Sequence, residues 1–276
     1  MSPVPVVGVG VGVVVGVAVG VGVTVDGAVG TITLDRAAKR NAVSYGMWVA
    51  LEAACDQLAG DAAVRVVVLR GAGEHFCAGA DIADLLAPRQ AGEPTFMEVN
   101  MAAENALAGL AKPTIAVVQG DCIGGGCALA IDCDFRLATG DSRFGITPAK
   151  LGIVYPPASL ERAVALLGPA VKRLLFTGDL IGATEAHRIG LVDELLAADA
   201  LEIRLYELCT TLAQRSLLTQ AATKEMIAAI VEHGAVTAEM TRRWADEVTA
   251  SGEMAEGVTA FQERRAPHFP WRGATR

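Results

Sequence analysis

The chain has little of what binding surfaces for nucleic acids or metal ions require. Its 23 Lys and Arg residues are outnumbered by 31 Asp and Glu residues, which gives a formal net charge of -8. Because no basic cluster offsets this acidic excess, we predict no nucleic-acid partner. The six cysteines include no Cys-X-X-Cys pair, and no histidine stands at metal-ligand spacing from them. We therefore predict no metal site and interpret the cysteines as reduced thiols of a cytoplasmic protein.

Charge is missing altogether from the Val/Gly-rich stretch Val4–Val23. Its length would fit a membrane span. However, dense glycine disfavours a helix, and the basic segment of a signal peptide is absent. The stretch is typical of a loose strand or a low-complexity arm. We therefore predict no membrane role and assign residues 1–22 to a first, separate segment.

The rest of the chain has the hydrophobic patterning of one large α/β domain. Residues 44–58 predict an amphipathic helix, and short apolar runs at residues 64–69 and 115–118, which follow it, predict buried strands. The segments 23–25 and 29–34 flank Asp26-Gly27 and predict a hairpin.

Three amphipathic helices are predicted near the C-terminus. They span residues 201–212, 220–231 and 236–248, and their apolar faces exceed what one subunit should need to cover. These faces would serve either plain core packing or contacts between subunits.

Three consecutive glycines, Gly124 to Gly126, stand between the strand predicted at residues 115–118 and an apolar segment that begins at Cys127. If that segment is a helix, the glycine amides lie at the positive end of its dipole. Such a turn predicts an anion or oxyanion site. The alternative is a tight turn that needs glycine only for its backbone freedom.

A second glycine-containing turn, residues 70–82, follows the strand predicted at residues 64–69. Its small residues also leave main-chain amides exposed. Two such turns that face each other across one cleft would supply paired donors to a developing oxyanion.

Four motifs, taken in this order, resemble the crotonase superfamily, also called the enoyl-CoA hydratase/isomerase superfamily. They are LDRAAKRNA at residues 34–42, FCAGADI at 76–82, GGGCALA at 124–130 and FTGDLIGATEAHRIGLVDEL at 176–195. The resemblance implies an α/β spiral of repeated ββα units over residues 23–200. It also implies a C-terminal helical trimerisation region over residues 201–276, a homotrimer or hexamer, and an acyl-CoA substrate.

The same resemblance implies roles for single residues. The family holds the thioester carbonyl oxygen between two main-chain amides, which fall here on Ala80 and Gly125. Phe261 and Arg264 match positions that reach the ligand of a neighbouring subunit. The remaining positions that match coenzyme A contacts are Ala37, Lys39, Ala78, Asp81 and Ile82. Coenzyme A is part of the substrate, and no separate cofactor is implied.

Hydratases of this family use two glutamates, and both positions differ in this chain. Ala128 stands at the first position and Pro148 at the second. Neither residue can move a proton. Because a positioned acid or base contributes about 10² to 10⁴ in rate, hydration by the usual route is not expected.

The segment from Thr147 to Tyr155, TPAKLGIVY, is similar to the methylmalonyl-CoA decarboxylase branch, in which the tyrosine lies beside the substrate carboxylate. Decarboxylation relies on oxyanion donors and needs no base. We slightly prefer this chemistry, with Thr147 and Tyr155 as candidate catalytic residues, although that branch has a histidine in place of Ala80. Alternatively, the Tyr155 hydroxyl binds a backbone group and Thr147 caps a turn.

Two other acids lie near the expected acyl pocket. Asp132 follows Ala128 by one helical turn, and Glu104 lies on a helix predicted at residues 102–110. For each acid, three interpretations stay open: an ion pair with another side chain, a solvated position, and a catalytic acid. The remaining hypotheses are thus an enoyl-CoA hydratase or isomerase that uses other carboxylates, and a non-catalytic protein that binds coenzyme A.

Overall fold

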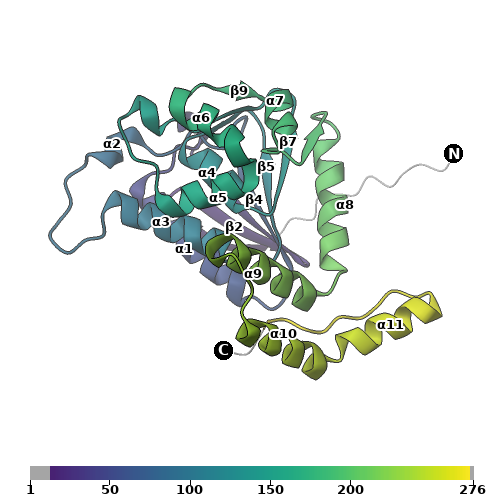
Figure 1. Ribbon diagram of the computed structural model, residues 1–276. Coiled ribbons are helices and arrows are strands. Elements are labelled where there is room, and N and C mark those ends of the chain that lie inside the picture. Colours follow the sequence, from purple (N-terminus) through teal and green to yellow (C-terminus); the bar gives the residue numbers. More distant parts are fainter. Residues whose placement is uncertain (1–12, 274–276) are drawn as a thin grey trace.

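A seven-stranded sheet in the order β1-β2-β3-β4-β5-β7-β10 forms the centre of the computed structural model (Figure 1). The structure describes residues 13–273. Strands β1 to β3 are antiparallel, and every later neighbour pair is parallel. The strands are β1 Val13–Ala18, β2 Val21–Asp26, β3 Val29–Leu34, β4 Val66–Gly71, β5 Thr114–Val118, β7 Phe135–Thr139 and β10 Glu194–Leu196.

A smaller sheet contains β6 (Asp121–Ile123), β8 (Arg143–Gly145) and β9 (Ile181–Gly182) in that order. From β5 to β8, consecutive strands alternate between the two sheets, since β5 and β7 lie in the large sheet and β6 and β8 in the small one. The pair β5-β6 leads into helix α4 (Gly125–Asp132). This alternation confirms the predicted α/β spiral of ββα units.

Helices fill the connections between these strands, as parallel pairing requires. Ser44 begins α1 by accepting a hydrogen bond from the amide of Met47. Thr95 and Glu98 form a reciprocal capping box at the start of α3. Besides α4, the helices of the body are α1 Tyr45–Gly60, α2 Ile82–Leu85, α3 Phe96–Ala108, α5 Pro157–Leu167, α6 Val171–Thr177 and α7 Ala183–Arg188.

The large sheet is covered on both faces. One face packs on a core that includes Trp48 and Leu51 of α1. The other face carries Val66 and Val68 and packs against α8 (Leu201–Ala213). The two predicted buried strands are therefore confirmed, although β4 begins at Val66, two residues later than the predicted start, and β5 begins at Thr114. The boundary at residue 200 stays a prediction, although α8 itself packs on the sheet.

The N-terminal Val/Gly-rich stretch lies partly inside the large sheet. Residues 13–18 form β1, which pairs with β2; residues 1–12 are outside the described part of the chain. The hairpin predicted around Asp26-Gly27 is confirmed, because Asp26 pairs with Val29 across the turn. Within residues 13–273, no helix has the length and apolar character needed to cross a membrane.

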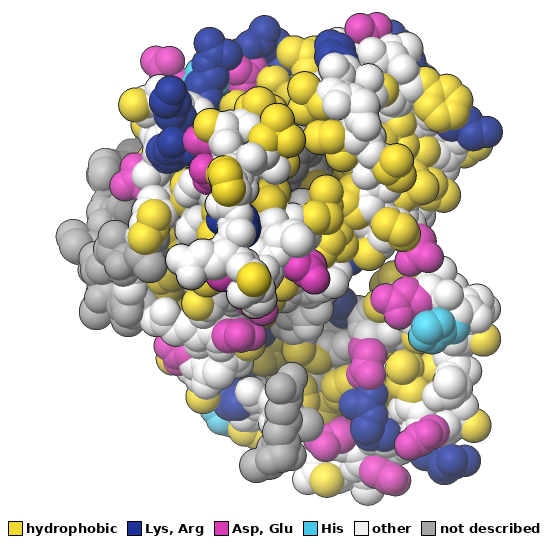
Figure 2. Space-filling model, turned by 90° about the vertical axis from the view of Figure 1, so that its left-hand side faces the viewer, with side chains coloured by type: hydrophobic (Ala, Val, Ile, Leu, Met, Phe, Trp, Pro, Cys, Tyr) yellow, Lys and Arg dark blue, Asp and Glu magenta, His cyan; other side chains and the backbone are white. Residues whose placement is uncertain are grey.

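The C-terminal region contains the three predicted helices and one more. After α8 come α9 (Leu217–His233), α10 (Ala238–Ser251) and α11 (Glu253–Glu263). We did not predict α11. Figure 1 shows α10 and α11 together below the body of the molecule. At their height in Figure 2, acidic and basic side chains are mixed, whereas hydrophobic side chains gather on the body above, and a gap is visible between the two parts.

Candidate active site

Backbone hydrogen bonds join the second glycine turn to the LDRAAKRNA motif. The amide of Ala78 donates to the carbonyl of Arg40 at 2.9 Å, and the amide of Val43 donates to Gly79 at 2.7 Å. The amide of Asp81 then donates to the Val43 carbonyl at 2.9 Å. This bridge uses the groups on either side of Ala80, so the Ala80 amide is not part of it.

The three-glycine turn needs its glycines for close packing as well as for backbone freedom. Gly124 has a φ of 56° and precedes the first residue of α4. A Cβ atom on Gly126 would overlap the carbonyl of Cys77. On Gly79, in the opposite turn, a Cβ would come within 2.8 Å of the Ile123 carbonyl. The run therefore meets packing as well as backbone requirements, and the anion or oxyanion site at this turn stays a prediction.

The structure brings the two predicted amide donors, Ala80 and Gly125, together. The position that a Cβ of Gly125 would take lies 3.6 Å from the Ala80 nitrogen. A Cβ of Gly79 would lie 3.4 Å from the nitrogen of Gly125. As the first residue of α4, Gly125 has an amide with no acceptor inside the helix, and this amide lies at the positive end of the dipole.

The predicted contacts for coenzyme A fall into two groups. Ala37 and Lys39 form a short 3₁₀ helix, and the bonds described above hold Ala78 beside this segment. The Asp81 carboxylate accepts a 2.5 Å hydrogen bond from Arg36, which lowers the pKa of Asp81. Asp81 is thus engaged within the protein.

Ile82, the next residue, is 57% exposed and accessible to a ligand. Phe261 and Arg264 belong to the second group, at the end of α11, which lies below the body in Figure 1. The chain alone does not bring them to the glycine turns. Their contact with the ligand of a neighbouring subunit stays a prediction.

Neither Tyr155 nor Thr147 makes the structural hydrogen bond that was the alternative to a catalytic role. The Tyr155 hydroxyl is buried and has no hydrogen-bond partner within residues 13–273, so the alternative of a bond to a backbone group is wrong. Thr147 precedes the 3₁₀ helix Pro148–Lys150 but makes no capping hydrogen bond. Its Oγ1 lies 3.6 Å from the position of a Cβ on Gly124. Thr147 therefore stands beside the glycine turn.

A cluster of buried polar side chains joins α3, α4 and α5, which lie together in Figure 1. Arg162 Nε lies 2.6 Å from Oδ1 of Asp132, and Arg162 Nη2 lies 3.7 Å from Oε2 of Glu104. Glu104 also accepts hydrogen bonds from Ser159 Oγ at 2.5 Å and from Asn100 Nδ2 at 2.9 Å. Glu104 is 2% exposed and Asp132 is 5% exposed. One guanidinium thus serves two buried carboxyl groups, which we call the Asp132–Glu104 cluster.

Comparison with known proteins identifies the family. The sequence profile of the enoyl-CoA hydratase/isomerase family matches residues 24–272. The chain belongs to the enoyl-CoA hydratase/isomerase family. It is 33% identical over 254 residues to a putative enoyl-CoA hydratase of Thermus thermophilus, with 88% of this chain and 98% of the relative covered. It is 32% identical over 246 residues to the crotonyl-CoA hydratase of Syntrophomonas wolfei, which covers 86% of this chain and 92% of the relative.

The fold comparison agrees with the sequence. A crystal structure of an enoyl-CoA hydratase/isomerase family member superposes with a TM-score of 0.84 and 35% sequence identity. The superposition covers 92% of this chain and 97% of the other. The fold and the family predicted from the four motifs are therefore confirmed.

Burial has the largest effect on the pKa values of the two acids in the Asp132–Glu104 cluster. Burial raises the pKa of Asp132 well above its usual range; the charge of Glu104 adds to the rise and Arg162 opposes it. Burial also raises the pKa of Glu104, whereas hydrogen bonds from Ser159 and Asn100 lower it. Asp132 is buried and paired with Arg162, so the alternative of a solvated Asp132 is wrong.

Sequence reasoning missed the partners of these acids. Ser159 and Arg162 were not singled out, although they stand three residues apart and therefore face the same side of α5. Trp48 was also missed. Its ring would lie 3.2 Å from a Cβ on Gly125, and its buried Nε1 has no hydrogen-bond partner in the described part of the chain. Trp48 belongs to the apolar face of the amphipathic helix predicted at residues 44–58, and that pattern does not indicate which residue of another element it contacts.

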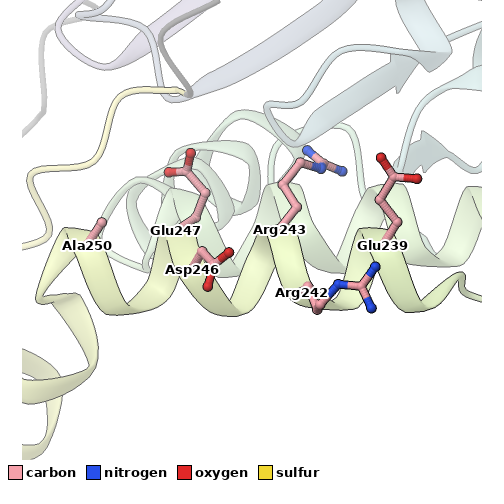
Figure 3. Close-up of a pocket in the computed structure, with 6 residues that line it drawn as sticks. All are labelled: Glu239, Arg242, Arg243, Asp246, Glu247 and Ala250. Carbon is pink, nitrogen blue, oxygen red and sulfur yellow. The ribbon is translucent and has the colours of Figure 1, made fainter.

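A surface hollow of about 430 Å³ lies on the C-terminal region, on α10 (Figure 3). The residues that line it are Glu239, Arg242, Arg243, Asp246, Glu247 and Ala250. All of them come from one side of one exposed helix, and Arg243 already pairs with Glu225. Because α10 lies apart from α4 in Figure 1, this hollow is not part of the candidate active site.

Proposed function

We propose that this family member is an acyl-CoA enzyme that holds a thioester carbonyl oxygen between the amides of Ala80 and Gly125. The observation that carries the proposal is the contact between the two glycine turns, with each turn presenting one of these amides. Negative charge develops on the carbonyl oxygen as the thioester becomes an enolate. Two fixed donors at the positive end of α4 stabilise that charge.

Among reactions that pass through a thioester enolate, we slightly prefer decarboxylation of a malonyl-type thioester. The bond between Cα and the substrate carboxylate breaks, carbon dioxide leaves, and the electron pair enters the thioester as an enolate. A proton from solvent then adds at Cα. Ala128 and Pro148 offer no acid or base, and the cleavage of the carbon–carbon bond needs none. The buried and unpaired Tyr155 hydroxyl supports the preference, because a substrate carboxylate would give it a partner.

Hydration or double-bond isomerisation is the second candidate. It is supported by the Asp132–Glu104 cluster, because buried carboxyl groups with raised pKa values are suited to acid–base catalysis. It is also supported by the names of the relatives, which include a crotonyl-CoA hydratase.

Assays of the purified protein with methylmalonyl-CoA and crotonyl-CoA distinguish these candidates. We expect release of carbon dioxide from methylmalonyl-CoA and only slow hydration of crotonyl-CoA. Fast hydration without decarboxylation would support the second candidate. If the protein binds these thioesters but converts neither of them nor any other acyl-CoA of a broad panel, it is a non-catalytic protein that binds coenzyme A.

We also propose that the protein assembles as a homotrimer or a hexamer of paired trimers. Large apolar side chains are exposed on the single chain, and they include Phe176 of α6 and Phe261 of α11. Such exposure is typical of surfaces that are covered in an assembly. Light scattering of the purified protein measures the mass directly, and a monomer at all concentrations would contradict this proposal.

A further inference from the structure

Trp48 packs against the turn that carries the proposed oxyanion donor Gly125. The position of a Cβ on Gly125 lies 3.2 Å from Cζ2 and 3.4 Å from Cη2 of the Trp48 ring, and 3.6 Å from the Ala80 nitrogen. One point is therefore close to the indole and to both proposed donors. Trp48 is completely buried, so its ring forms the inner wall of this part of the candidate site.

The edge of the indole that carries its nitrogen faces the glycine turn. Cζ2, the ring atom nearest to the Cβ position of Gly125, is bonded to Cε2, the carbon that also carries Nε1. The chain before α1 is fixed to the opposite turn, because the amide of Val43 donates to the Gly79 carbonyl at 2.7 Å. The Trp48 amide then donates to the Ser44 carbonyl at 3.0 Å. Backbone hydrogen bonds thus set the position from which the indole reaches the turn.

Trp48 Nε1 is a buried donor without an acceptor. It has no hydrogen-bond partner among residues 13–273, although the large majority of buried polar side-chain atoms in proteins have one. The other two tryptophans of the chain are paired. Nε1 of Trp244 donates to Glu225 at 2.8 Å, and Nε1 of Trp271 donates to Glu247 at 3.1 Å. Because an indole nitrogen can only donate, the free N–H group of Trp48 indicates an acceptor that a ligand supplies.

A thioester held between Ala80 and Gly125 has two arms, and burial indicates which of them Trp48 meets. The sulfur arm continues into coenzyme A, whose charged phosphates must stay hydrated. This arm therefore leaves toward the surface, where Ile82 is 57% exposed. The acyl arm points to the buried side, on which Trp48 is 0% exposed and Ala128, in the first turn of α4, is 2% exposed. The indole thus lies on the side of the acyl group.

We propose that Trp48 Nε1 donates a hydrogen bond to a second oxygen on the acyl group, beyond the thioester carbonyl, and so selects acyl-CoA substrates that carry such an oxygen. This role rests on the proposed function and names the class of its substrate. An acyl group without a second oxygen leaves the buried N–H group unpaired, and such a site discriminates against it. A malonyl-type carboxylate supplies the acceptor and keeps one oxygen for Tyr155, whereas a crotonyl chain supplies none.

Nuclear magnetic resonance of protein labelled with ¹⁵N in the indole rings reports this hydrogen bond directly. The chain has three tryptophans, and Trp48→Phe identifies the signal of Trp48. We expect acetoacetyl-CoA, which has a second carbonyl oxygen, to move the Trp48 N–H proton to lower field. Butyryl-CoA has the same four acyl carbons without that oxygen and should move the signal much less. A shift of equal size with both thioesters, or a shift with neither, overturns the proposal.

Calorimetry measures how much the N–H group contributes to the binding of the same two thioesters. We expect Trp48→Phe to reduce the preference for acetoacetyl-CoA over butyryl-CoA, expressed as the ratio of their dissociation constants, by about tenfold. Phenylalanine is smaller than tryptophan, but the packing that is lost affects both thioesters, so the ratio isolates the hydrogen bond. Trp271→Phe is the matched control, because it removes an indole whose donor is already paired, and it should leave the ratio unchanged.

The outcomes separate this role from the proposed function. If both thioesters bind more tightly than free coenzyme A but Trp48→Phe leaves their ratio unchanged, the role of Trp48 alone is overturned. If neither thioester binds more tightly than free coenzyme A, the thioester is not held between the two amides, and the proposed function fails together with this role. If Trp48→Phe does not fold, Trp244→Phe and Trp271→Phe identify the Trp48 signal by elimination, and its shifts in the unsubstituted protein test the proposal.

Discussion

At the residue scale, the candidate site depends on main-chain groups that side chains would block. Gly125 illustrates this. A methyl group there would lie 3.2 Å from the Trp48 ring and 3.6 Å from the Ala80 nitrogen, so it would occupy the space between the two amides. Trp48 is completely buried and has little room to move.

We predict that Gly125→Ala lowers kcat by about 10²-fold, the usual effect of losing one oxyanion donor. Binding of free coenzyme A, measured by calorimetry, should change little. The matched control is Gly140→Ala, because a Cβ on Gly140 meets no atom within 4 Å. Equal activity of both variants would contradict the use of the Gly125 amide.

Tyr155→Phe should separate activity from stability. The hydroxyl has no hydrogen-bond partner among the described residues, so its removal should leave the free energy of unfolding unchanged or raise it by up to about 1 kcal/mol. Turnover should nevertheless fall, because the hydroxyl is the proposed partner of the substrate carboxylate. Tyr206→Phe on the exposed side of α8 is the control for both measurements. A loss of stability together with normal turnover would assign Tyr155 a structural role.

At the element scale, α3 matters because it carries Glu104 into the cluster. Its start is set by the capping box, in which the Thr95 hydroxyl accepts from the Glu98 amide and the Glu98 carboxylate accepts from the Thr95 amide. The sequence predicted this helix only from residue 102 onward. The structure begins it at Phe96, directly after a segment rich in proline and glycine that obscures the cap.

Removal of the Thr95 cap by Thr95→Ala should lower the free energy of unfolding by about 1 kcal/mol. The physical reason is that one amide in the first turn loses its acceptor. Urea denaturation measures the change. Thr95→Ser keeps the hydroxyl and should retain most of the stability; if serine is as destabilising as alanine, the hydroxyl is not the stabilising group.

At the scale of the whole molecule, Arg65 holds the C-terminal region to the body. This buried side chain precedes β4 and donates from Nε to the Ala213 carbonyl at 2.8 Å and from Nη2 to the Arg215 carbonyl at 2.8 Å. A longer bond of 3.4 Å reaches Phe269. The carbonyls of Ala213 and Arg215 lie at the end of α8 and in the connection to α9, so one side chain fixes where the last helices start.

We predict that Arg65→Met lowers the free energy of unfolding by roughly 2 kcal/mol or more, because charge-assisted hydrogen bonds to main-chain carbonyls are lost. Limited proteolysis should cut the chain faster after residue 213. Arg173→Met changes an exposed arginine paired with Glu185 and should shift stability by less than about 0.5 kcal/mol. Similar effects of the two substitutions would contradict the anchoring role.

The four motifs in their order were enough to predict the fold, because their resemblance to the crotonase superfamily implies the α/β spiral. Apolar runs likewise predicted β4 and β5, since strands covered on both faces must be apolar throughout. The cluster of Asp132, Glu104 and Arg162 was not predictable in the same way. Its members belong to three helices, and the sequence contains no sign of which side chains meet between them.

The sequence by itself determined the family, the α/β spiral and the two glycine turns, because local backbone requirements leave a local pattern. Tertiary structure alone decided that the amides of Ala80 and Gly125 belong to turns in contact, and that Tyr155 lies buried without a partner. It also decided that two carboxyl groups share one guanidinium. The physical reason is that burial and charge pairing depend on which elements pack together, and that packing removes the water that would otherwise ionise both acids.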